Sequence, residues 1–361
     1  MAGGGRADLV AAGESLPSAG TPAGALAVVV RGGRVESVHL GHLAIVRPDG
    51  AQLFAVGDPG TTIWPRSAVK PVQAVAMLRA GLEIDDAGLA LACASHSGTP
   101  EQVNGVRAIL ARAGLTEGDL QNTPDLPLDP ESSFAWRSGG VGAASVTQNC
   151  SGKHAAMLAA CVRNGWDTVG YRDPDHPLQR RVRETLAELS GEPVADVTVD
   201  GCGAPLFSTT VVGLARAFGR IAAAGTEPGR DDAEARVARA MTAHPWLVGG
   251  PGRDVSRFMA AMPGLIVKDG AEGVYAAGLG EGSAVAFKVA DGSARPRAAI
   301  LAASLEVLWR QAGRATPEAD AVAAVREIGE LPVLGHGLPV GRVVAVLGEL
   351  PAGRGEIGRQ G

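Results

Sequence analysis

Hydrophobic and polar positions alternate near the start of the chain, as they do in β-strands. An apolar run over 25–30 and an alternating stretch over 35–40 flank the Gly32-Gly33 pair, which is typical of a β-hairpin turn. A second turn signal follows at Pro48-Asp49-Gly50. We therefore predict an antiparallel meander of about four strands over residues 25–56.

Farther along the chain, apolar positions recur with the period of amphipathic helices. The predicted helices are 68–80, 101–114, 153–164, 178–190, 208–223, 233–243 and 299–313. Short apolar runs predict further strands at 88–93, 264–267, 273–277, 283–289 and 342–348. Strands cluster at both ends of the chain, so we predict a mixed α/β fold whose sheet is completed by its two terminal segments.

Composition limits the classes of protein that remain. Hydrophobic residues make up 46% of the 361 residues and charged residues only 20%, which excludes disorder over most of the length. The net charge of −5 and the lack of a basic stripe argue against nucleic acid as a partner. No run of about 18 apolar residues occurs without Gly, Pro or charge, so we expect no membrane span.

The ends of the chain differ in composition from its middle, and the first residues lack the apolar core of a signal peptide. We expect flexible tails over 1–24 and 351–361 and one catalytic domain over 25–350. Widely spaced cysteines in so long a chain need no disulfide framework, which favours a reducing, cytoplasmic location. These cysteines are Cys93, Cys150, Cys161 and Cys202.

Ser67 and Lys70 stand three residues apart just before an apolar run, and Pro71 fixes the start of the predicted helix. We expect Ser67 at or beside the N-cap, on the same face as Lys70. The positive end of a helix and partial burial favour a neutral amine, which would accept the Ser67 proton. Taken alone, the pattern also fits a capping serine beside a solvated lysine.

The segment 93–102 joins a predicted strand to a predicted helix. Thr99 and Gln102 have the spacing of a capping box, so Ser95 and His96 fall in the loop before the helix. Catalytic groups are often built on such loops, and His96 is a candidate base. Hydrogen bonding within the loop explains the same residues equally well.

A third group of polar residues stands at a predicted helix start and in a Gly-rich bend. Cys150, Lys153 and His154 open the helix, and Asp200 and Cys202 lie in the bend. Two thiolates can share a metal ion, but the two cysteines are 52 residues apart and form no Cys-x-x-Cys pattern. Buried, inert cysteines are the alternative interpretation.

Lys268 ends an apolar strand and enters a Gly-rich turn. In isolation this segment is typical of a solvated turn. Considered with the other three segments, it completes a set of Ser, Lys, Cys and His residues at the ends of secondary-structure elements. Such a set is typical of a hydrolase active site.

The chain resembles the thermolabile bacterial L-asparaginase II family, which occurs in rhizobia and actinobacteria and is unrelated to the periplasmic asparaginases that use a Thr nucleophile. The resemblance extends from about residue 25 to about residue 350. In combination and order, its motifs are specific. They are Arg31-Gly32-Gly33 with Glu36-Ser37, Gly57-Asp58-Pro59, Pro65-Arg66-Ser67-Ala68-Val69-Lys70-Pro71, Ser95-His96-Ser97-Gly98, Asn149-Cys150-Ser151-Gly152-Lys153-His154, Asp200-Gly201-Cys202-Gly203-Ala204-Pro205 and Lys268-Asp269-Gly270-Ala271-Glu272-Gly273.

The resemblance implies a fold similar to serine β-lactamases and glutaminases, with a helical region packed on an antiparallel sheet, and a homodimer. It implies two catalytic Ser–Lys pairs. Ser67 would be the nucleophile with Lys70 as its base, and Ser95 with Lys268 would form the second pair.

The resemblance also implies a zinc ion that tunes substrate binding and is not strictly required for hydrolysis. Some family members carry a further cysteine upstream of the second lysine, and this chain has none after Cys202. The implied zinc ligands are Cys150, Lys153 and Cys202. The implied substrate contacts are Arg66, His154 and Asp200.

The resemblance therefore implies an L-asparaginase that hydrolyses L-asparagine to L-aspartate and ammonia through an acyl-enzyme on Ser67. Two alternatives stay open. Ser67-x-x-Lys70 and Lys268-x-Gly270 also resemble motifs of penicillin-recognising serine hydrolases, although an intervening Ser-Asp-Asn element is lacking. The second alternative is a zinc-binding homologue that has no catalytic activity.

Overall fold

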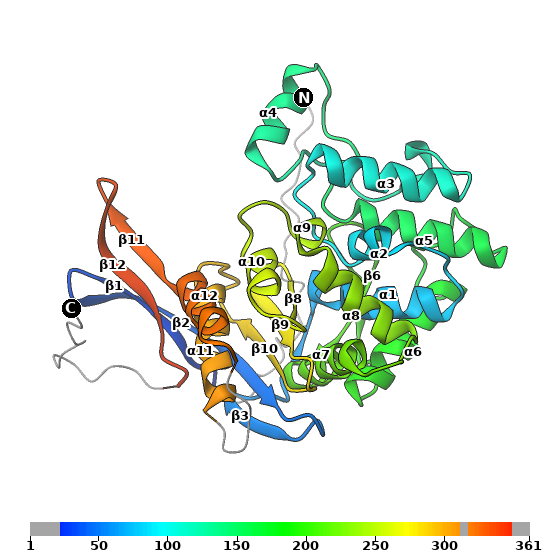
Figure 1. The fold of residues 1–361 in the computed structure, drawn as a ribbon. Helices are drawn as coiled ribbons and strands as arrows, with labels where there is room; N and C mark the ends of the chain where they lie inside the picture. Colours follow the sequence, from blue (N-terminus) through cyan, green and yellow to red (C-terminus); the bar gives the residue numbers. More distant parts are fainter. Residues whose placement is uncertain (1–21, 311–316, 349–361) are drawn as a thin grey trace, which may run out of the picture.

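The computed structural model describes residues 22–310 and 317–348, and Figure 1 shows an antiparallel sheet beside a body of helices. The strands of the main sheet are β1 (Gly24–Arg31), β2 (Arg34–Val46), β3 (Gln52–Val56), β8 (Ile266–Asp269), β9 (Val274–Gly278), β10 (Ala284–Val289), β11 (Leu331–Gly335) and β12 (Leu338–Ala345). Their order is β11-β12-β1-β2-β10-β9-β8, and β3 also pairs with β2. Two short ribbons join β4 (Thr62–Ile63) to β7 (Thr209–Thr210) and β5 (Val197–Val199) to β6 (Pro205–Phe207).

Most helices form the body on the right of Figure 1. They are α1 (Lys70–Arg79), α2 (Asp86–Ala92), α3 (Pro100–Arg112), α4 (Pro130–Ser138), α5 (Ser151–Asn164), α6 (Pro177–Ser190), α7 (Val211–Thr226), α8 (Ala233–Ala243), α9 (Pro245–Val248) and α10 (Asp254–Ala261). Two more helices, α11 (Arg297–Trp309) and α12 (Ala319–Gly329), lie against the sheet.

Helices cover both faces of the central strands. A Cβ atom on Gly278 of β9 would lie 2.3 Å from the Phe218 carbonyl oxygen, so α7 approaches that face closely. Tyr275, three residues earlier in β9, points to the opposite face because side chains alternate along a strand. The Arg297 guanidinium of α11 lies 5.3 Å from the Tyr275 ring centroid. The sheet is therefore the middle layer between α7 and α11.

The two ends of the described chain meet in the sheet, as the distribution of apolar runs predicts. β1 pairs antiparallel with β12, from Ala27 opposite Ala345 to Arg31 opposite Gly341. The predicted hairpin joins β1 to β2 around Gly32-Gly33. The predicted mixed α/β fold, an antiparallel sheet with a helical region, is confirmed.

Two predictions of secondary structure are wrong. The meander over 25–56 has three strands, because β2 continues through Gly41 without a turn. A Cβ atom at Gly41 would lie 2.1 Å from the Lys288 carbonyl oxygen, so this glycine permits close strand contact. The predicted strand 88–93 is helix α2, which begins where the Asp85 side chain accepts the Gly88 N–H and whose Ala and Leu residues favour helix.

Residues 1–21 and 351–361 of the two predicted tails lie outside the described residues, and Gly24 already belongs to β1.

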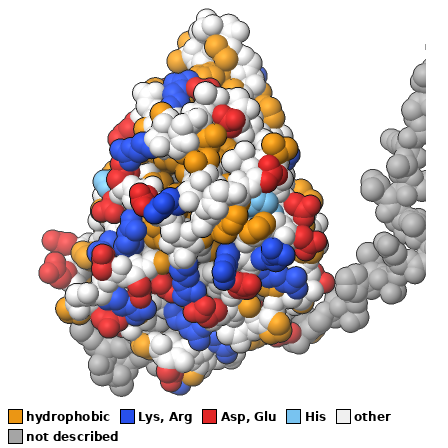
Figure 2. All heavy atoms as spheres, turned by 90° about the vertical axis from the view of Figure 1, so that its right-hand side faces the viewer, with side chains coloured by type: hydrophobic (Ala, Val, Ile, Leu, Met, Phe, Trp, Pro, Cys, Tyr) orange, Lys and Arg blue, Asp and Glu red, His pale blue; other side chains and the backbone are white. Residues whose placement is uncertain are grey.

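On the face shown in Figure 2, Lys and Arg side chains are interspersed with Asp and Glu, so this face carries no continuous basic stripe. Within the described ranges, no helix is both long and apolar enough to span a lipid bilayer.

Candidate active site

Ser95 lies where α2 ends and the chain turns toward α3. Cys93 caps α2, and the Ser95 N–H donates to the Val248 carbonyl oxygen at 3.1 Å, which holds the loop against α9. The predicted capping box at the start of α3 is present, with reciprocal hydrogen bonds between Thr99 and Gln102. These contacts fix the position of Ser95, which is only 4% exposed.

Two buried lysines converge on the Ser95 hydroxyl. Lys70 Nζ, from the first residue of α1, lies 3.2 Å from Ser95 Oγ and 2.6 Å from the Ala94 carbonyl oxygen. Lys268 Nζ, from β8, lies 2.8 Å from the same Ser95 oxygen. Both lysines are fully buried. A hydroxyl between two amines can pass a proton in either direction, which is the arrangement that a proton relay requires.

Ser67 lies beside this group without a hydrogen bond to it. It sits inside a 3₁₀ turn, Arg66–Val69, so its predicted place at the cap of the helix is wrong: Val69 is the N-cap of α1. Ser67 is partly exposed as a residue, and its hydroxyl makes no hydrogen bond to any residue that the structure describes. The expected Ser67–Lys70 contact is not formed, because the Lys70 amine turns toward Ser95 and the Ala94 carbonyl.

Arg66 connects the Ser67 turn to the loop that carries Cys202. Its backbone has a φ of 50°, a left-handed conformation that costs a non-glycine residue about 1 kcal/mol or more. Its Nε donates to Asp200 Oδ1 at 2.7 Å. Because such a conformation persists only where the surroundings impose it, this ion pair and the turn fix each other.

Two glycines allow the segments of the site to approach one another. A Cβ atom at Gly270 would lie 2.7 Å from the Pro65 carbonyl oxygen, so the end of β8 packs against the turn that carries Ser67. A Cβ atom at Gly152 would lie 2.3 Å from the Leu91 carbonyl oxygen, so α5 packs against α2. The motifs that contain these glycines are thus brought to one place by backbone contact.

The structure also brings Cys150, Lys153 and Cys202 together. Lys153 Nζ donates to Cys202 Sγ at 3.1 Å, and all three side chains are buried. A hydrogen bond from Cys202, with Lys70 and Lys153 nearby, holds the pKa of the Cys150 thiol well below its usual value despite burial. Burial acts to lower the pKa of Lys153, but Cys202, Cys150 and Asp200 raise it above its usual value. The cluster is therefore a thiolate–ammonium pair beside a second thiol.

The donor types in this thiol cluster fit a zinc ion. Two sulfur atoms and one nitrogen atom are ligand types that zinc accepts, provided that Lys153 gives up its proton. Within residues 22–310 and 317–348, no group of three or more His, Cys, Asp or Glu side chains is placed to hold a metal ion. Any zinc site here therefore depends on the lysine as its third protein ligand.

This dependence gives a test. If the cluster holds one zinc ion per chain, replacing Cys202 by alanine is expected to abolish zinc binding, because only two protein ligands remain. The measurement is metal content after dialysis against zinc and then against buffer. Cys161→Ala is the matched control, since Cys161 is also buried but lies outside the cluster. Equal zinc in both variants contradicts this ligand set.

Burial lowers the pKa of both histidines near the site, His96 and His154, so that the neutral rings are favoured at neutral pH. Burial lowers the pKa of His96 to about 3, and its ring is held by the Gly98 N–H at Nδ1 and by Ser151 Oγ, 2.8 Å from Nε2. These contacts give His96 a structural role. His154 Nδ1 lies 2.6 Å from the Tyr171 hydroxyl, and its Nε2 has no hydrogen-bond partner among the described residues.

Sequence reasoning assigned no role to two charged residues beside Lys268. Asp269 Oδ1 lies 2.5 Å from Lys268 Nζ, and Arg253 donates to both Asp269 and the Ser95 carbonyl oxygen. Asp269 is adjacent to Lys268 in the sequence, where its residue type is equally typical of a turn. Arg253 stands in no motif, so only the fold brings it here.

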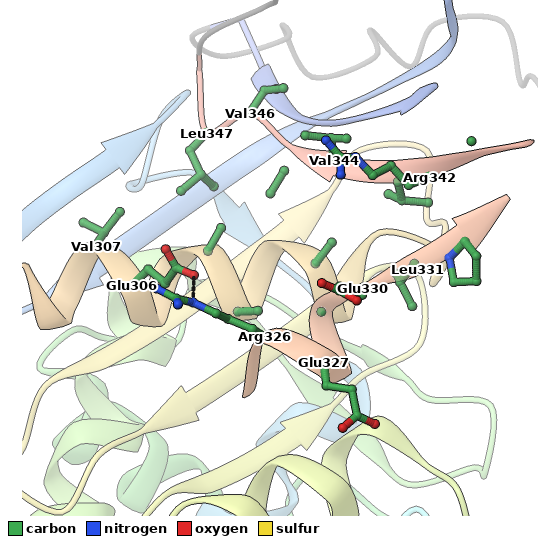
Figure 3. A pocket seen from close by; sticks show the side chains of 18 of the residues that line it. Glu306, Val307, Arg326, Glu327, Glu330, Leu331, Arg342, Val344, Val346 and Leu347 are labelled. Atoms are coloured by element: carbon green, nitrogen blue, oxygen red, sulfur yellow. Dashed lines mark hydrogen bonds and ion pairs between the residues drawn. The ribbon is translucent and has the colours of Figure 1, made fainter. Parts of the chain in front are cut away.

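A groove of about 900 Å³ lies elsewhere, between α11, α12 and β12 (Figure 3). Several of its charged side chains pair with one another, as Arg326 does with Glu306 and Arg257 with Glu327. None of the Ser, Lys or Cys residues of the candidate site lines this groove. The groove therefore does not define the active site.

Comparison with known proteins identifies the family. A sequence profile for L-asparaginase II matches residues 27–345. The chain belongs to the L-asparaginase II family. The family is named for L-asparaginase, which is an amidohydrolase activity. No curated protein sequence matches the chain at a significant level.

The solved structures that are similar to this family member have low sequence identity to it. Mglu in its Tris and glutamate form has 15% identity and a TM-score of 0.42, covering 76% of this chain and 61% of its own. A β-lactamase from Mycobacterium bovis has 15% identity and a TM-score of 0.41, covering 80% and 95%. A Bacillus glutaminase has 12% identity and a TM-score of 0.38, covering 70% and 84%. The chain thus spans about three fifths of the Mglu chain.

Proposed function

We propose that this chain is an L-asparaginase that hydrolyses L-asparagine to L-aspartate and ammonia. The observation that carries the proposal is the Ser95 hydroxyl shared by the Lys70 and Lys268 amines, which forms a buried proton path beside the partly exposed Ser67. Of the two serines, Ser67 is the more accessible to a substrate. We therefore assign it as the nucleophile and Ser95 as part of the relay.

The reaction proceeds by acyl transfer. The Lys70 amine first turns from Ser95 toward Ser67. Ser67 Oγ then attacks the side-chain carboxamide carbon while Lys70 accepts the hydroxyl proton, and Lys70 returns this proton to the nitrogen, which leaves as ammonia. A β-aspartyl ester remains on Ser67. Water then attacks this ester and gives a proton to the same amine. Lys70 passes this proton to Ser67 Oγ as the ester bond breaks, so aspartate leaves and the hydroxyl is restored. Ser95 and Lys268 pass protons to and from Lys70, so that Lys70 is available as a base in each step.

Substrate binding is assigned to polar groups next to the Ser67 turn. Arg66 and Asp200 offer a cation and an anion that match the carboxylate and ammonium groups of an amino acid, and His154 offers its unpartnered Nε2. Zinc, held by Cys150, Lys153 and Cys202, would supply a positive charge that tunes substrate binding. We further propose that the enzyme is a cytoplasmic homodimer.

Purified protein incubated with L-asparagine is expected to release ammonia and aspartate in equal amounts, with L-glutamine tested in parallel. Production of both is measured with and without added zinc. If no ammonia appears in either condition, the proposal is contradicted and a non-catalytic zinc-binding protein is favoured. Hydrolysis of a chromogenic cephalosporin without ammonia release from asparagine would instead indicate a penicillin-recognising hydrolase.

A further inference from the structure

The Lys268 amine has three hydrogen-bond partners, and they differ in what they can offer. Its Nζ lies 2.8 Å from Ser95 Oγ, 2.7 Å from the Asp269 carbonyl oxygen and 2.5 Å from Asp269 Oδ1. A carbonyl oxygen and an ionised carboxylate can only accept hydrogen bonds, whereas a hydroxyl can also donate. Ser95 is therefore the one member of this set that can give a proton to the amine.

A neutral lysine amine has two hydrogens and one lone pair. In this form the two hydrogens can satisfy the two Asp269 oxygens, which leaves the lone pair for the Ser95 hydroxyl, 2.8 Å from Nζ. We propose that Asp269 is a positioning residue, whose carboxylate and carbonyl oxygens together direct the Lys268 lone pair at Ser95. This inference rests on the proposed function, since it concerns the proton transfer between Lys268, Ser95 and Lys70.

The carboxylate of Asp269 is itself held in one orientation. Arg253 Nη2 donates to Asp269 Oδ2 at 2.6 Å, and Arg297 Nη1 lies 3.6 Å from the same oxygen. The two arginines thus occupy Oδ2, and Oδ1 is left for Lys268. Arg253 also donates to the Ser95 carbonyl oxygen at 3.2 Å. The same arginine therefore holds both the Asp269 carboxylate and the backbone of Ser95. Asp269 is buried, so these ion pairs are shielded from water.

The charges around Lys268 support a base at moderately alkaline pH. Burial lowers its pKa to about 8, Asp269 acts to raise it, and Lys70 and Arg253 act to lower it. The neighbouring Cys93 thiol is neutral there, because burial raises its pKa to about 12. The neutral amine therefore gains population as the pH rises through about 8. Without the carboxylate, the amine would lose its proton at lower pH.

Two variants separate orientation from charge. Asp269→Asn is expected to lower kcat for asparagine by about 100-fold with KM little changed, and to move the rising limb of the kcat/KM profile to lower pH. Asp269→Glu keeps the charge but displaces it by one methylene, so kcat falls while the limb stays near its original pH. The matched control is Asp254→Asn, because Asp254 also faces Arg297, at 4.0 Å, and has no contact with Lys268 among the described residues.

A second readout does not depend on turnover. The chain has only four lysines, Lys70, Lys153, Lys268 and Lys288, so ¹³Cε-lysine NMR gives few signals. The Lys268 signal, assigned by its loss in Lys268→Arg, should titrate at lower pH in Asp269→Asn than in the wild type and should not move in Asp254→Asn. An unchanged titration in Asp269→Asn overturns the inference.

The remaining outcomes are equally decisive. If Asp269→Asn does not fold, Asp269→Glu tests the positioning role instead. A kcat of Asp269→Glu equal to that of the wild type overturns this role. Equal losses in Asp269→Asn and Asp254→Asn, with no movement of the pH profile, would mean that Asp269 serves stability alone. A wild-type chain that releases no ammonia contradicts the proposed function, and the NMR titration still tests the arrangement around Lys268.

Discussion

Ser67→Ala is expected to lower kcat for asparagine hydrolysis by about 10⁴-fold or more, because a missing nucleophile removes the acyl-enzyme route. The fold should be unaffected, since the Ser67 hydroxyl makes no hydrogen bond to the described residues. Ammonia release gives the rate, and the melting temperature checks the fold. Ser95→Ala serves as the comparison, with a smaller loss of about 100-fold, because it interrupts a relay and leaves the nucleophile in place.

Acyl-enzyme trapping then identifies the nucleophile directly. Acid quenching of the wild-type reaction should preserve a β-aspartyl ester, which mass spectrometry locates on one tryptic peptide. Trypsin separates the two serines, because Arg66 and Arg79 bound the peptide 67–79 and Arg107 ends the next one, which contains Ser95. Cleavage after Lys70 is blocked by the following proline. The added mass is expected on 67–79; its appearance on the other peptide would make Ser95 the nucleophile.

The parts of the fold that follow from local rules are predictable from the sequence. The Gly32-Gly33 turn and the Thr99–Gln102 capping box are local, and both are present. Gly41 could not be interpreted in this way, because its role is set by the approach of β10, which is far away in the sequence. The Ala- and Leu-rich run of α2 is ambiguous by its nature, since a short apolar run fits a buried strand or a buried helix.

In the candidate site too, the residues are predictable from local motifs, but their contacts depend on packing. The sequence motifs name Lys70, Ser95 and Lys268, but the hydrogen-bond partners of each depend on how the α2–α3 loop, α1 and β8 pack. An unused signal was the scarcity of lysine: of 33 basic residues only four are lysines, and three of these are fully or almost fully buried near the site. Arginine does not give up its proton in proteins, so a buried lysine in an arginine-rich chain is a candidate position for an amine that can lose one, as proposed for Lys70 and Lys268.

Lys70→Met is expected to reduce kcat by about 10³- to 10⁴-fold, because it removes both the proposed base for Ser67 and a hydrogen bond to Ser95. Methionine has a similar length and no charge, so packing around the fully buried side chain is largely kept. The rate of ammonia release is measured at saturating asparagine across the pH range. Lys288→Met is the matched control, since the Lys288 amine binds the Glu272 and Val289 carbonyl oxygens, away from the Ser95 hydroxyl.

Lys70→Arg separates proton transfer from charge. A guanidinium keeps the positive charge but cannot accept a proton at neutral pH, so a base at this position predicts that the arginine variant is as inactive as the methionine variant. If Lys70 acted only by stabilising negative charge on the reacting oxygen, the arginine variant would retain much of the activity. Activity of Lys70→Arg near that of the wild type would therefore contradict the role of Lys70 as base and would leave Lys268, through Ser95, as the group that accepts the proton.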